Sequence, residues 1–173
     1  MIDSTRDDEE KLRAITNSAL DAVILMDSDG NIAFWNPAAE RLFGYSEGEA
    51  LGQNARDLLM PERFRARYDK GFEAFRRSGT GAIVGKVVEL SAKHKGGHEV
   101  PVDLAVSSIC VEGAFWASAI VRDISERQQA ARALEASEAR YRRLFEAAKD
   151  GILILDADSG KIVDVNPFLV KLT

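Results

Sequence analysis

The sequence has very little cysteine: Cys110 is the single one in 173 residues. One cysteine excludes a disulfide within the chain and fits a reducing compartment. No apolar run approaches the roughly 20 residues that a membrane helix needs, and the acidic start MIDSTRDDEE is unlike a signal peptide. We therefore expect a cytoplasmic protein with no membrane segment in this chain, and a structural role for Cys110.

Basic charge is also scarce. The sequence has 23 Lys and Arg residues and 28 Asp and Glu residues, which gives a net charge of −5. Sequence-independent binding to nucleic acid requires a basic face, so we expect no nucleic-acid partner. Two short basic runs, RFRAR at 63–67 and ARYRRLF at 139–145, lie in helical patterns and are interpreted as solvated helix faces.

Motifs for catalysis and for metal binding are missing as well. Gly44, Gly48 and Gly52 lie among helix starts, and no strand–GxxxxGK[ST]–helix unit surrounds them. The Ser, His and Asp residues show no spacing that assembles a nucleophile with a base. His94 and His98 flank a turn, where their i,i+4 spacing has little value for zinc. We expect neither a catalytic residue nor a metal site.

What is present fits one ordinary domain with an appendage, since 46% of the residues are hydrophobic and 29% are charged. Residues 1–20 predict an amphipathic helix, with Leu12 and Ile15 on its apolar face. The runs DAVILM and NIAFW, separated by the turn residues DSDG, predict a β-hairpin over residues 21–35.

Helices are predicted over residues 36–79. Asn36 and Ser46 are good N-cap residues, so two or three short helices should follow one another. Pro61 begins a longer helix that ends near Gly79. Four aromatic side chains share one face of it: Phe64, Tyr68, Phe72 and Phe75.

Three strand-like runs follow, namely AIVGKVVEL, HEVPVDLAVSSI and AFWASAIVRDI. They predict an antiparallel meander, which completes an α+β domain over residues 21–123. Residues 124–149 contain no Gly or Pro and predict a helical linker. Its apolar seam, weakened by Ala and Ser, is compatible both with a coiled coil and with packing on its own domain; its larger members are Leu134, Tyr141 and Leu144.

The chain also repeats itself. DAVILMDSDGNIAFWNP at 21–37 returns as DGILILDADSGKIVDVNP at 150–167, with one extra residue in the turn. The second copy comprises only residues 150–173, which are too few to complete the fold. We interpret the chain as a tandem array cut inside its second module, whose apolar strands should pair with another chain or dock on their own domain.

These residues carry a family resemblance. It rests on 21–54 (DAVILM to GQN), LLMPE at 58–62, the KGG turn with PVDLAV at 95–106, and RDIS at 122–125. In this order and spacing, residues 10–125 resemble a PAS sensor domain, and residues 140–173 resemble the start of a second. The resemblance implies a five-stranded antiparallel sheet with short helices on one face, flanked by N-terminal and C-terminal helices, around a small pocket.

The same resemblance implies a sensory role in signal transduction and a homodimer formed through the flanking helices, here Leu12, Ile15, Leu134, Tyr141 and Leu144. The output module, a histidine kinase of a two-component system or a diguanylate cyclase, would lie beyond residue 173. A PAS domain without ligand that only mediates protein interaction is the alternative. In both cases the present chain is expected not to be an enzyme.

Flavin is one cofactor that the resemblance raises. GQNARDLL at 52–59 is similar to the photosensors of the LOV type, which need a Cys directly after the Asn and a Gln on the last strand. This chain has Ala55 and Val121 at these positions. We therefore do not expect flavin adduct chemistry.

Haem is the other. LLMPERFRARYDKGF at 58–72 resembles the long helix of the rhizobial oxygen-sensor kinases, which bind haem iron through a His on that helix. Tyr68 stands at the matching position. Phenolate can ligate ferric haem, but a Tyr on an apolar helical face is more often part of the core. Haem and flavin are both less favoured than a colourless ligand or none.

The pocket can be sketched from the same pattern. If the long helix covers the sheet, Tyr68 and Phe72 face alternate residues of two strands, and the small Ala residues leave space for a planar or hydrophobic ligand. In the other interpretation, no ligand binds and side chains alone fill this space. The strand residues are Leu104, Val106, Ala117, Ala119 and Val121. Asp123, at the start of the linker, is the expected point of signal transfer.

Overall fold

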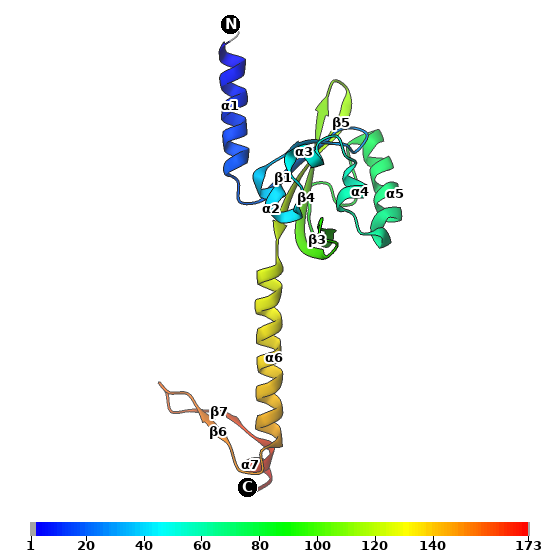
Figure 1. The fold of residues 1–173 in the computed structure, drawn as a ribbon. Helices are drawn as coiled ribbons and strands as arrows, with labels where there is room; N and C mark the ends of the chain where they lie inside the picture. Colours follow the sequence, from blue (N-terminus) through cyan, green and yellow to red (C-terminus); the bar gives the residue numbers. More distant parts are fainter. Residues whose placement is uncertain (1–2, 173) are drawn as a thin grey trace. The chain divides into compact units, whose positions relative to one another are not determined.

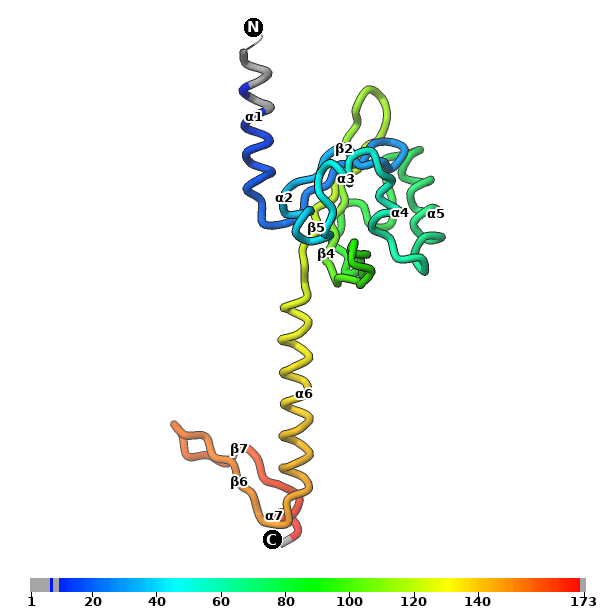
Figure 2. The backbone as a smooth tube through the Cα atoms, in the orientation of Figure 1, coloured from blue at the N-terminus to red at the C-terminus, as the bar shows by residue number. Residues whose placement is uncertain are grey.

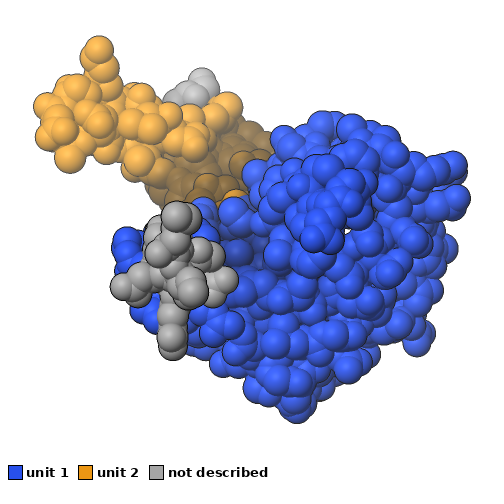
Figure 3. All heavy atoms as spheres, turned by 90° about the horizontal axis from the view of Figure 1, so that it is seen from above, with its two compact units in different colours: residues 1–125 blue, residues 126–173 orange. Residues whose placement is uncertain are grey.

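The computed structural model describes residues 3–172, without the side chains of residues 3–6, 8, 9 and 172. Residues 1 and 2 of the predicted leading helix lie outside this range. The chain forms two compact units, Met1–Ser125 and Glu126–Thr173, coloured separately in Figure 3. Each unit is described by itself.

The first unit follows the predicted order of elements (Figure 1). Helix α1 leads into a β-hairpin, three short helices and a longer helix come next, and three strands close the unit. The bounds are α1 Asp3–Ser18, β1 Ala22–Met26, β2 Ile32–Trp35, α2 Pro37–Phe43, α3 Glu47–Ala50, α4 Ala55–Leu59, α5 Glu62–Ser78, β3 Val87–Lys93, β4 Glu99–Val111 and β5 Ala114–Asp123.

The five strands form one antiparallel sheet in the order β2-β1-β5-β4-β3. The last strand, β5, therefore lies in the centre, between the first hairpin and the β3–β4 pair. Ile24 of β1 is opposite Ala119 of β5, and Leu104 of β4 is opposite Val121. The predicted α+β fold with a five-stranded sheet is confirmed.

One face of the sheet is buried under the helices. Alternation along β1 and β5 places Ala22, Ile24, Ala119 and Val121 in the core, together with Trp35 of β2. Full burial of an Ile side chain contributes roughly 1.5–3 kcal/mol. The first and last strands of the unit thus bury their apolar side chains in one core, because β5 pairs with β1.

One strand begins later than predicted. The run AIVGKVVEL enters the sheet only at Val87, and Val84 makes a single parallel bridge to Val106. Gly85 lies between them at φ +74°, in the left-handed region that favours glycine and interrupts an extended strand. The apolar pattern did not distinguish this bend from strand.

The second unit contains most of helix α6 (Ser125–Ala147), a hairpin of β6 (Leu153–Leu155) and β7 (Ile162–Val165), and the short helix α7 (Pro167–Leu172). Figure 2 traces these segments from yellow through orange to red. No helix within residues 3–172 is long and apolar enough to cross a membrane.

Two buried asparagines organise the two hairpins. Asn36 accepts hydrogen bonds at Oδ1 from the backbone N of Val23 (2.9 Å) and Ala39 (2.9 Å), so it ties β1 to the start of α2. Its Nδ2 donates to the carbonyls of Thr16 (3.0 Å) and Asp21 (3.1 Å). One side chain thereby fixes the end of α1, the first strand and the first turn of α2.

Asn166 repeats this arrangement in the second unit. Its Oδ1 accepts from the backbone N of Ile152 (2.9 Å) and Leu169 (3.1 Å), and its Nδ2 donates to the carbonyl of Asp150 (2.9 Å). Both asparagines are fully buried. A buried amide is stable only when it is hydrogen-bonded, so the Asn-Pro pair in each copy is a structural requirement of the hairpin.

Candidate functional site

Helix α5 packs against β5, as the aromatic pattern predicted. Tyr68 and Phe72 stack with ring centroids 5.6 Å apart, and Phe72 and Phe75 follow at 6.1 Å. Phe75 is buried, whereas Tyr68 and Phe72 are partly buried. The row of stacked rings gives this wall of the domain a flat aromatic surface.

The hydroxyl of Tyr68 is unusual. It is shielded from solvent, yet it has no hydrogen-bond partner among the described residues. Burial is the main cause that raises the pKa of Tyr68 to about 12; the nearby Asp69 carboxylate contributes to the shift and the Arg56 guanidinium opposes it. The side chain is therefore a neutral phenol at physiological pH. A buried donor without an acceptor costs about 1–3 kcal/mol, which a ligand with an acceptor atom would recover.

The β1–β2 turn touches the same wall. Gly30 at φ +84° lies so close to Phe72 that an added Cβ would come within 3.1 Å of the ring's Cζ. The backbone N of Gly30 donates to the carbonyl of Asp27 (3.0 Å), which closes the turn. Glycine is needed here both for the backbone angle and for the close approach of the ring.

The predicted strand residues of the pocket lie on the inner face of the sheet. Ala117, Ala119 and Val121 are buried on β5, whereas Leu104 and Val106 of β4 are partly buried and pack against the core. Pairing sets Leu104 beside Val121 and Val106 beside Ala119. These five side chains form one apolar surface; the ligand-binding role predicted for them stays a prediction.

Asp123 lies where β5 gives way to α6. Its Oδ1 accepts a hydrogen bond from the backbone N of Ser125 (2.7 Å), which is a helix cap. The next residue, Ile124, is buried, and its backbone N donates to the carbonyl of Pro101 on β4 (3.1 Å). The start of α6 is thus attached to two strands of the sheet.

A second contact joins the two ends of the domain. Arg122 donates from Nε (3.0 Å) and Nη2 (2.7 Å) to the carboxylate of Asp21, directly before β1. The hydrogen bond from Arg122 holds the pKa of Asp21 below its usual value. This ion pair, which the sequence pattern did not indicate, links the segment after α1 with the segment before α6.

The remaining candidates behave differently. His94 and His98 stack at 4.3 Å beside the β3–β4 turn, and the described residues contain no group of three or more His, Cys, Asp or Glu side chains that could hold a metal. Cys110 is exposed at the end of β4. A structural role for Cys110 is therefore not supported, because an exposed thiol there packs against no core.

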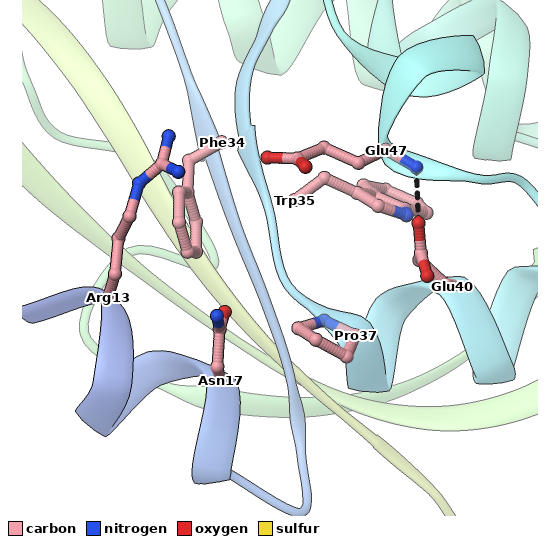
Figure 4. Close-up of a pocket in the computed structure, with 7 residues that line it drawn as sticks. All are labelled: Arg13, Asn17, Phe34, Trp35, Pro37, Glu40 and Glu47. Carbon is pink, nitrogen blue, oxygen red and sulfur yellow. Dashed lines mark hydrogen bonds between the residues drawn. The ribbon is translucent and has the colours of Figure 1, made fainter. Parts of the chain in front are cut away.

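Helix α1 and β2 form a small groove that sequence reasoning missed (Figure 4). Its volume is about 110 Å³. Glu47 extends its carboxylate across the groove, and its backbone N donates to Glu40. The lining residues are Arg13, Asn17, Phe34, Trp35, Pro37, Glu40 and Glu47.

The second unit has a groove at the equivalent place, of about 510 Å³. Arg142 of α6 corresponds to Arg13 of α1, and Pro167 corresponds to Pro37, as the internal repeat requires. Comparison of the two copies could have found both grooves in the sequence. The groove is therefore a feature of how each leading helix meets its hairpin.

Two models of the PAS family match the chain. The PAS fold model covers residues 10–124, and a PAS domain model covers residues 139–173. The chain belongs to the PAS family. The position of the second match agrees with the repeat of the hairpin and its buried Asn.

The similar proteins include sensors. The chain is 37% identical to the sensor protein FixL of Bradyrhizobium diazoefficiens over 121 residues, which is 70% of this chain and 24% of FixL. It is 32% identical to the oxygen sensor protein DosP of Escherichia coli over 112 residues, or 65% of this chain and 14% of DosP. The match thus spans a quarter or less of the length of these relatives.

Solved PAS domains have the same fold. The PAS domain of an HTR-like protein from Haloarcula marismortui superposes with a TM-score of 0.56 at 21% identity, over 70% of this chain and 96% of that one. A PAS domain from Colwellia psychrerythraea gives 0.55 at 28% identity, over 67% and 97%. Their near-complete coverage shows that one whole PAS domain is present.

Proposed function

We propose that residues 21–123 form a sensory PAS module that binds a small, largely apolar ligand with one hydrogen-bond acceptor, and that α6 passes the signal on. The observation that carries the ligand class is the solvent-shielded hydroxyl of Tyr68, which has no acceptor among the described side chains and backbone groups. The similarity to FixL and to other sensor proteins supports the sensory role.

The chemistry of the wall sets limits on the ligand. The aromatic row of Tyr68 and Phe72 offers a flat surface, and the facing strands contribute small apolar side chains, Ala117 and Ala119 among them. Because the phenol of Tyr68 stays protonated, it donates to a carbonyl or a similar neutral acceptor. A PAS domain without ligand, which acts only through protein contacts, is the competing interpretation.

Substitution of Tyr68 by Phe distinguishes the ligand-binding module from a PAS domain without ligand. Without ligand, removal of an unpaired buried hydroxyl should leave the free energy of unfolding unchanged or raise it by up to about 1 kcal/mol. In protein purified with its ligand, the same change should lower the thermal midpoint relative to wild type. Native mass spectrometry of both proteins reports the bound molecule. A ligand-free wild type whose Tyr68→Phe variant is destabilised would contradict the proposal.

Haem sensing is a second candidate, favoured by the similarity to an oxygen sensor protein over residues that include α5. The fit is poor, since ligation would need the phenolate of Tyr68, whose pKa burial raises to about 12. We expect no Soret band in the purified protein and none specific to Tyr68 after incubation with haemin. A Soret band that Tyr68→Phe abolishes and Tyr68→His shifts would establish haem instead.

We propose that the signal passes from β5 to α6 through Asp123. Its cap on Ser125 fixes the first turn of α6, so a shift of β5 changes how that turn begins. Asp123→Ala should release the turn and raise amide hydrogen exchange at residues 125–128, while Asp123→Asn keeps an oxygen for the cap and serves as the control. Equal exchange in both variants counts against this path.

The longer protein is proposed to be a homodimeric sensor whose output domain, a histidine kinase or a diguanylate cyclase, follows residue 173. The exposed apolar residues of the flanking helices support a partner there: Leu12, Ile15, Leu134, Tyr141 and Leu144. In this longer protein Asp123→Ala should change output activity, whereas Asp123→Asn should not. Sedimentation of the chain over a range of concentrations tests the dimer.

A further inference from the structure

The β3–β4 turn brings the two histidines of the chain together. His94 directly follows β3, and His98 directly precedes β4. The backbone N of His94 donates to the carbonyl of His98 (2.9 Å), so the two residues are held opposite each other. Their rings stack with centroids 4.3 Å apart. The sequence has no other histidine, so any imidazole chemistry of this protein takes place at this turn.

The end of α2 holds the ring of His94 in one orientation. Gly44, the C-cap of α2 at φ +78°, lies so close that a Cβ there would come within 2.7 Å of Nε2 of His94. The backbone N of Lys95 donates to the carbonyl of Phe43 (2.9 Å), which attaches the turn to the same helix end. Nε2 of His94 therefore faces α2, and Nδ1 faces the turn.

Two ring nitrogens converge beside Gly96. A Cβ at Gly96 would lie 3.1 Å from Nδ1 of His94 and 3.3 Å from Nδ1 of His98. The backbone N of Gly96 itself lies 2.8 Å from Nδ1 of His94, to which it donates a hydrogen bond. Glycine leaves open the space that a side chain would fill. Three nitrogen atoms thus border one small opening in an accessible turn.

These atoms suit copper(II) better than zinc. A zinc site takes three or four side-chain ligands, and the described residues gather no third His, Cys, Asp or Glu side chain around this pair. Copper(II) prefers a square arrangement of nitrogen and oxygen ligands, and nitrogen sites bind it most tightly among the divalent first-row metals. Metal–imidazole bonds are about 2.0 Å long, so nitrogens on adjacent corners of a square lie about 2.8 Å apart. The backbone N of Gly96 and Nδ1 of His94 have this separation.

We propose that the β3–β4 turn is a copper(II) site formed by Nδ1 of His94, Nδ1 of His98 and the backbone nitrogen of Gly96. Binding replaces the hydrogen bond from Gly96 to His94. The amide of Gly96 gives its proton to solvent, and the electron pair that this leaves on the nitrogen forms the bond to the metal. Water supplies the remaining corner of the square. We call this arrangement the turn site; it does not depend on the ligand proposed for the aromatic wall.

Two cations near the turn site are already paired with carboxylates. Nζ of Lys95 lies 2.5 Å from Oε1 of Glu49. The hydrogen bond from Lys95 is the main cause that lowers the pKa of Glu49 to about 2, so Glu49 stays ionised and neutralises this lysine. Arg63 pairs in the same way with Glu99, the residue after His98. A bound metal ion therefore meets no unpaired charge from these two side chains.

The turn site lies close in sequence to the contacts that hold the start of α6. Three residues after His98, the carbonyl of Pro101 accepts a hydrogen bond from the backbone N of Ile124 (3.1 Å), and Val102 pairs with Asp123. A metal that fixes the turn also fixes the beginning of β4, which carries both contacts. Copper should therefore act as a second input to α6, a role that rests on the path through Asp123 proposed above.

The test is titration of the full chain with copper(II) sulfate, with the exposed Cys110 changed to Ser so that no thiol competes. Electron paramagnetic resonance should show one axial copper signal with hyperfine splitting from three nitrogens. His94→Ala and His98→Ala should each weaken binding by at least about a hundredfold, because loss of a hydrogen-bond partner of a ligand alone costs roughly 10–100-fold. Amide hydrogen exchange at Ile124 should slow when copper binds.

A glycine pair tests the opening without removing a ligand. Gly96→Ala places a methyl group 3.1 and 3.3 Å from the two ring nitrogens, while both imidazoles and the amide remain. It should weaken copper binding at least about tenfold, within the range seen when the surroundings of metal ligands are changed. Gly71→Ala on α5 is the matched control, since a Cβ there meets nothing within 4 Å, and it should bind copper like the parent.

Other outcomes overturn the proposal. Copper that both histidine variants bind as tightly as the parent would be held by surface carboxylates, and a signal with two nitrogens would remove the amide from the site. Equal affinities of Gly96→Ala and Gly71→Ala would place the metal elsewhere. Copper that binds without slowing exchange at Ile124 would refute the second input. None of these results changes the effect expected for Tyr68→Phe, so the proposed ligand-binding module stands or falls separately.

Discussion

The two copies of the hairpin share their local structure but differ in their surroundings. Asn36 and Asn166 make matching bonds to a strand and to a helix start, and both are fully buried. Ile24 of the first copy is 2% exposed, whereas Leu153, its equivalent 129 positions later, is 43% exposed. The hairpin and its Asn therefore form from local instructions, and burial of the apolar face depends on the rest of the domain.

This difference separates two contributions to stability. The bonds of the Asn side chain act within about 20 residues of chain, so they recur wherever the repeat recurs. The hydrophobic contribution of β1 requires β5, which lies about 100 residues further along the chain. Paired substitutions in the two copies measure the two contributions independently, since both tryptophans, Trp35 and Trp116, lie in the first unit and report on its unfolding alone.

The largest contrast is expected for the strand residues. Ile24→Ala removes a buried side chain from the centre of the core and should lower the free energy of unfolding by about 4 kcal/mol. Leu153→Ala should leave the tryptophan transition in place, because Leu153 contributes to no core in the first unit. Denaturant titration followed by tryptophan fluorescence gives both values, and a loss below about 1 kcal/mol for Ile24→Ala would contradict the assigned core.

The next largest effect is expected for the two buried asparagines. Asn36→Ala leaves two backbone donors and two carbonyls without their partner, which should cost about 3 kcal/mol and lower the thermal midpoint by roughly 10 °C. Asn166→Ala should not move the same transition, although it should increase amide exchange at Ile152 and Leu169. If both variants shift the tryptophan signal equally, the two units fold as one.

The smallest effect concerns the aspartates. Asp21→Asn removes the ion pair with Arg122 and should cost about 0.5 kcal/mol at neutral pH, since the pair is largely solvated. The pKa of Asp21 is lowered in the folded protein, so its contribution is present above the unfolded pKa and is lost as the pH falls through the folded value. Acidification should therefore bring wild type and Asp21→Asn together, while Asp150→Asn should match wild type throughout.

Much of the fold was predictable because its determinants are local. N-caps at Asn36 and Ser46, the turn glycine of DSDG and the aromatic face of α5 each act within a few residues, and the structure confirms the elements they indicate. The repeat extended the same reasoning to the second copy. The late start of β3 at Val87 was missed because apolar residues on both sides of Gly85 conceal the bend.

The rest of the site depends on long-range pairing. The pairing of Ile24 with Ala119 joins the first and last strands of the unit, and the ion pair of Asp21 with Arg122 joins residues 101 positions apart. No spacing along the chain encodes either. The unpartnered hydroxyl of Tyr68 also depends on long-range packing. The sequence indicates a Tyr on an apolar helix face, but it does not show that no acceptor among the described residues lies near the hydroxyl in the folded domain.

The close approach of Gly30 to Phe72 couples the β1–β2 turn to the aromatic face of α5. A Cβ at residue 30 would lie 3.1 Å from Cζ of Phe72, so the ring would have to shift to make room for it. The backbone of Gly30 also has φ +84°, which is strained for a residue with a side chain. A single substitution in this turn therefore disturbs two elements that lie far apart in the sequence.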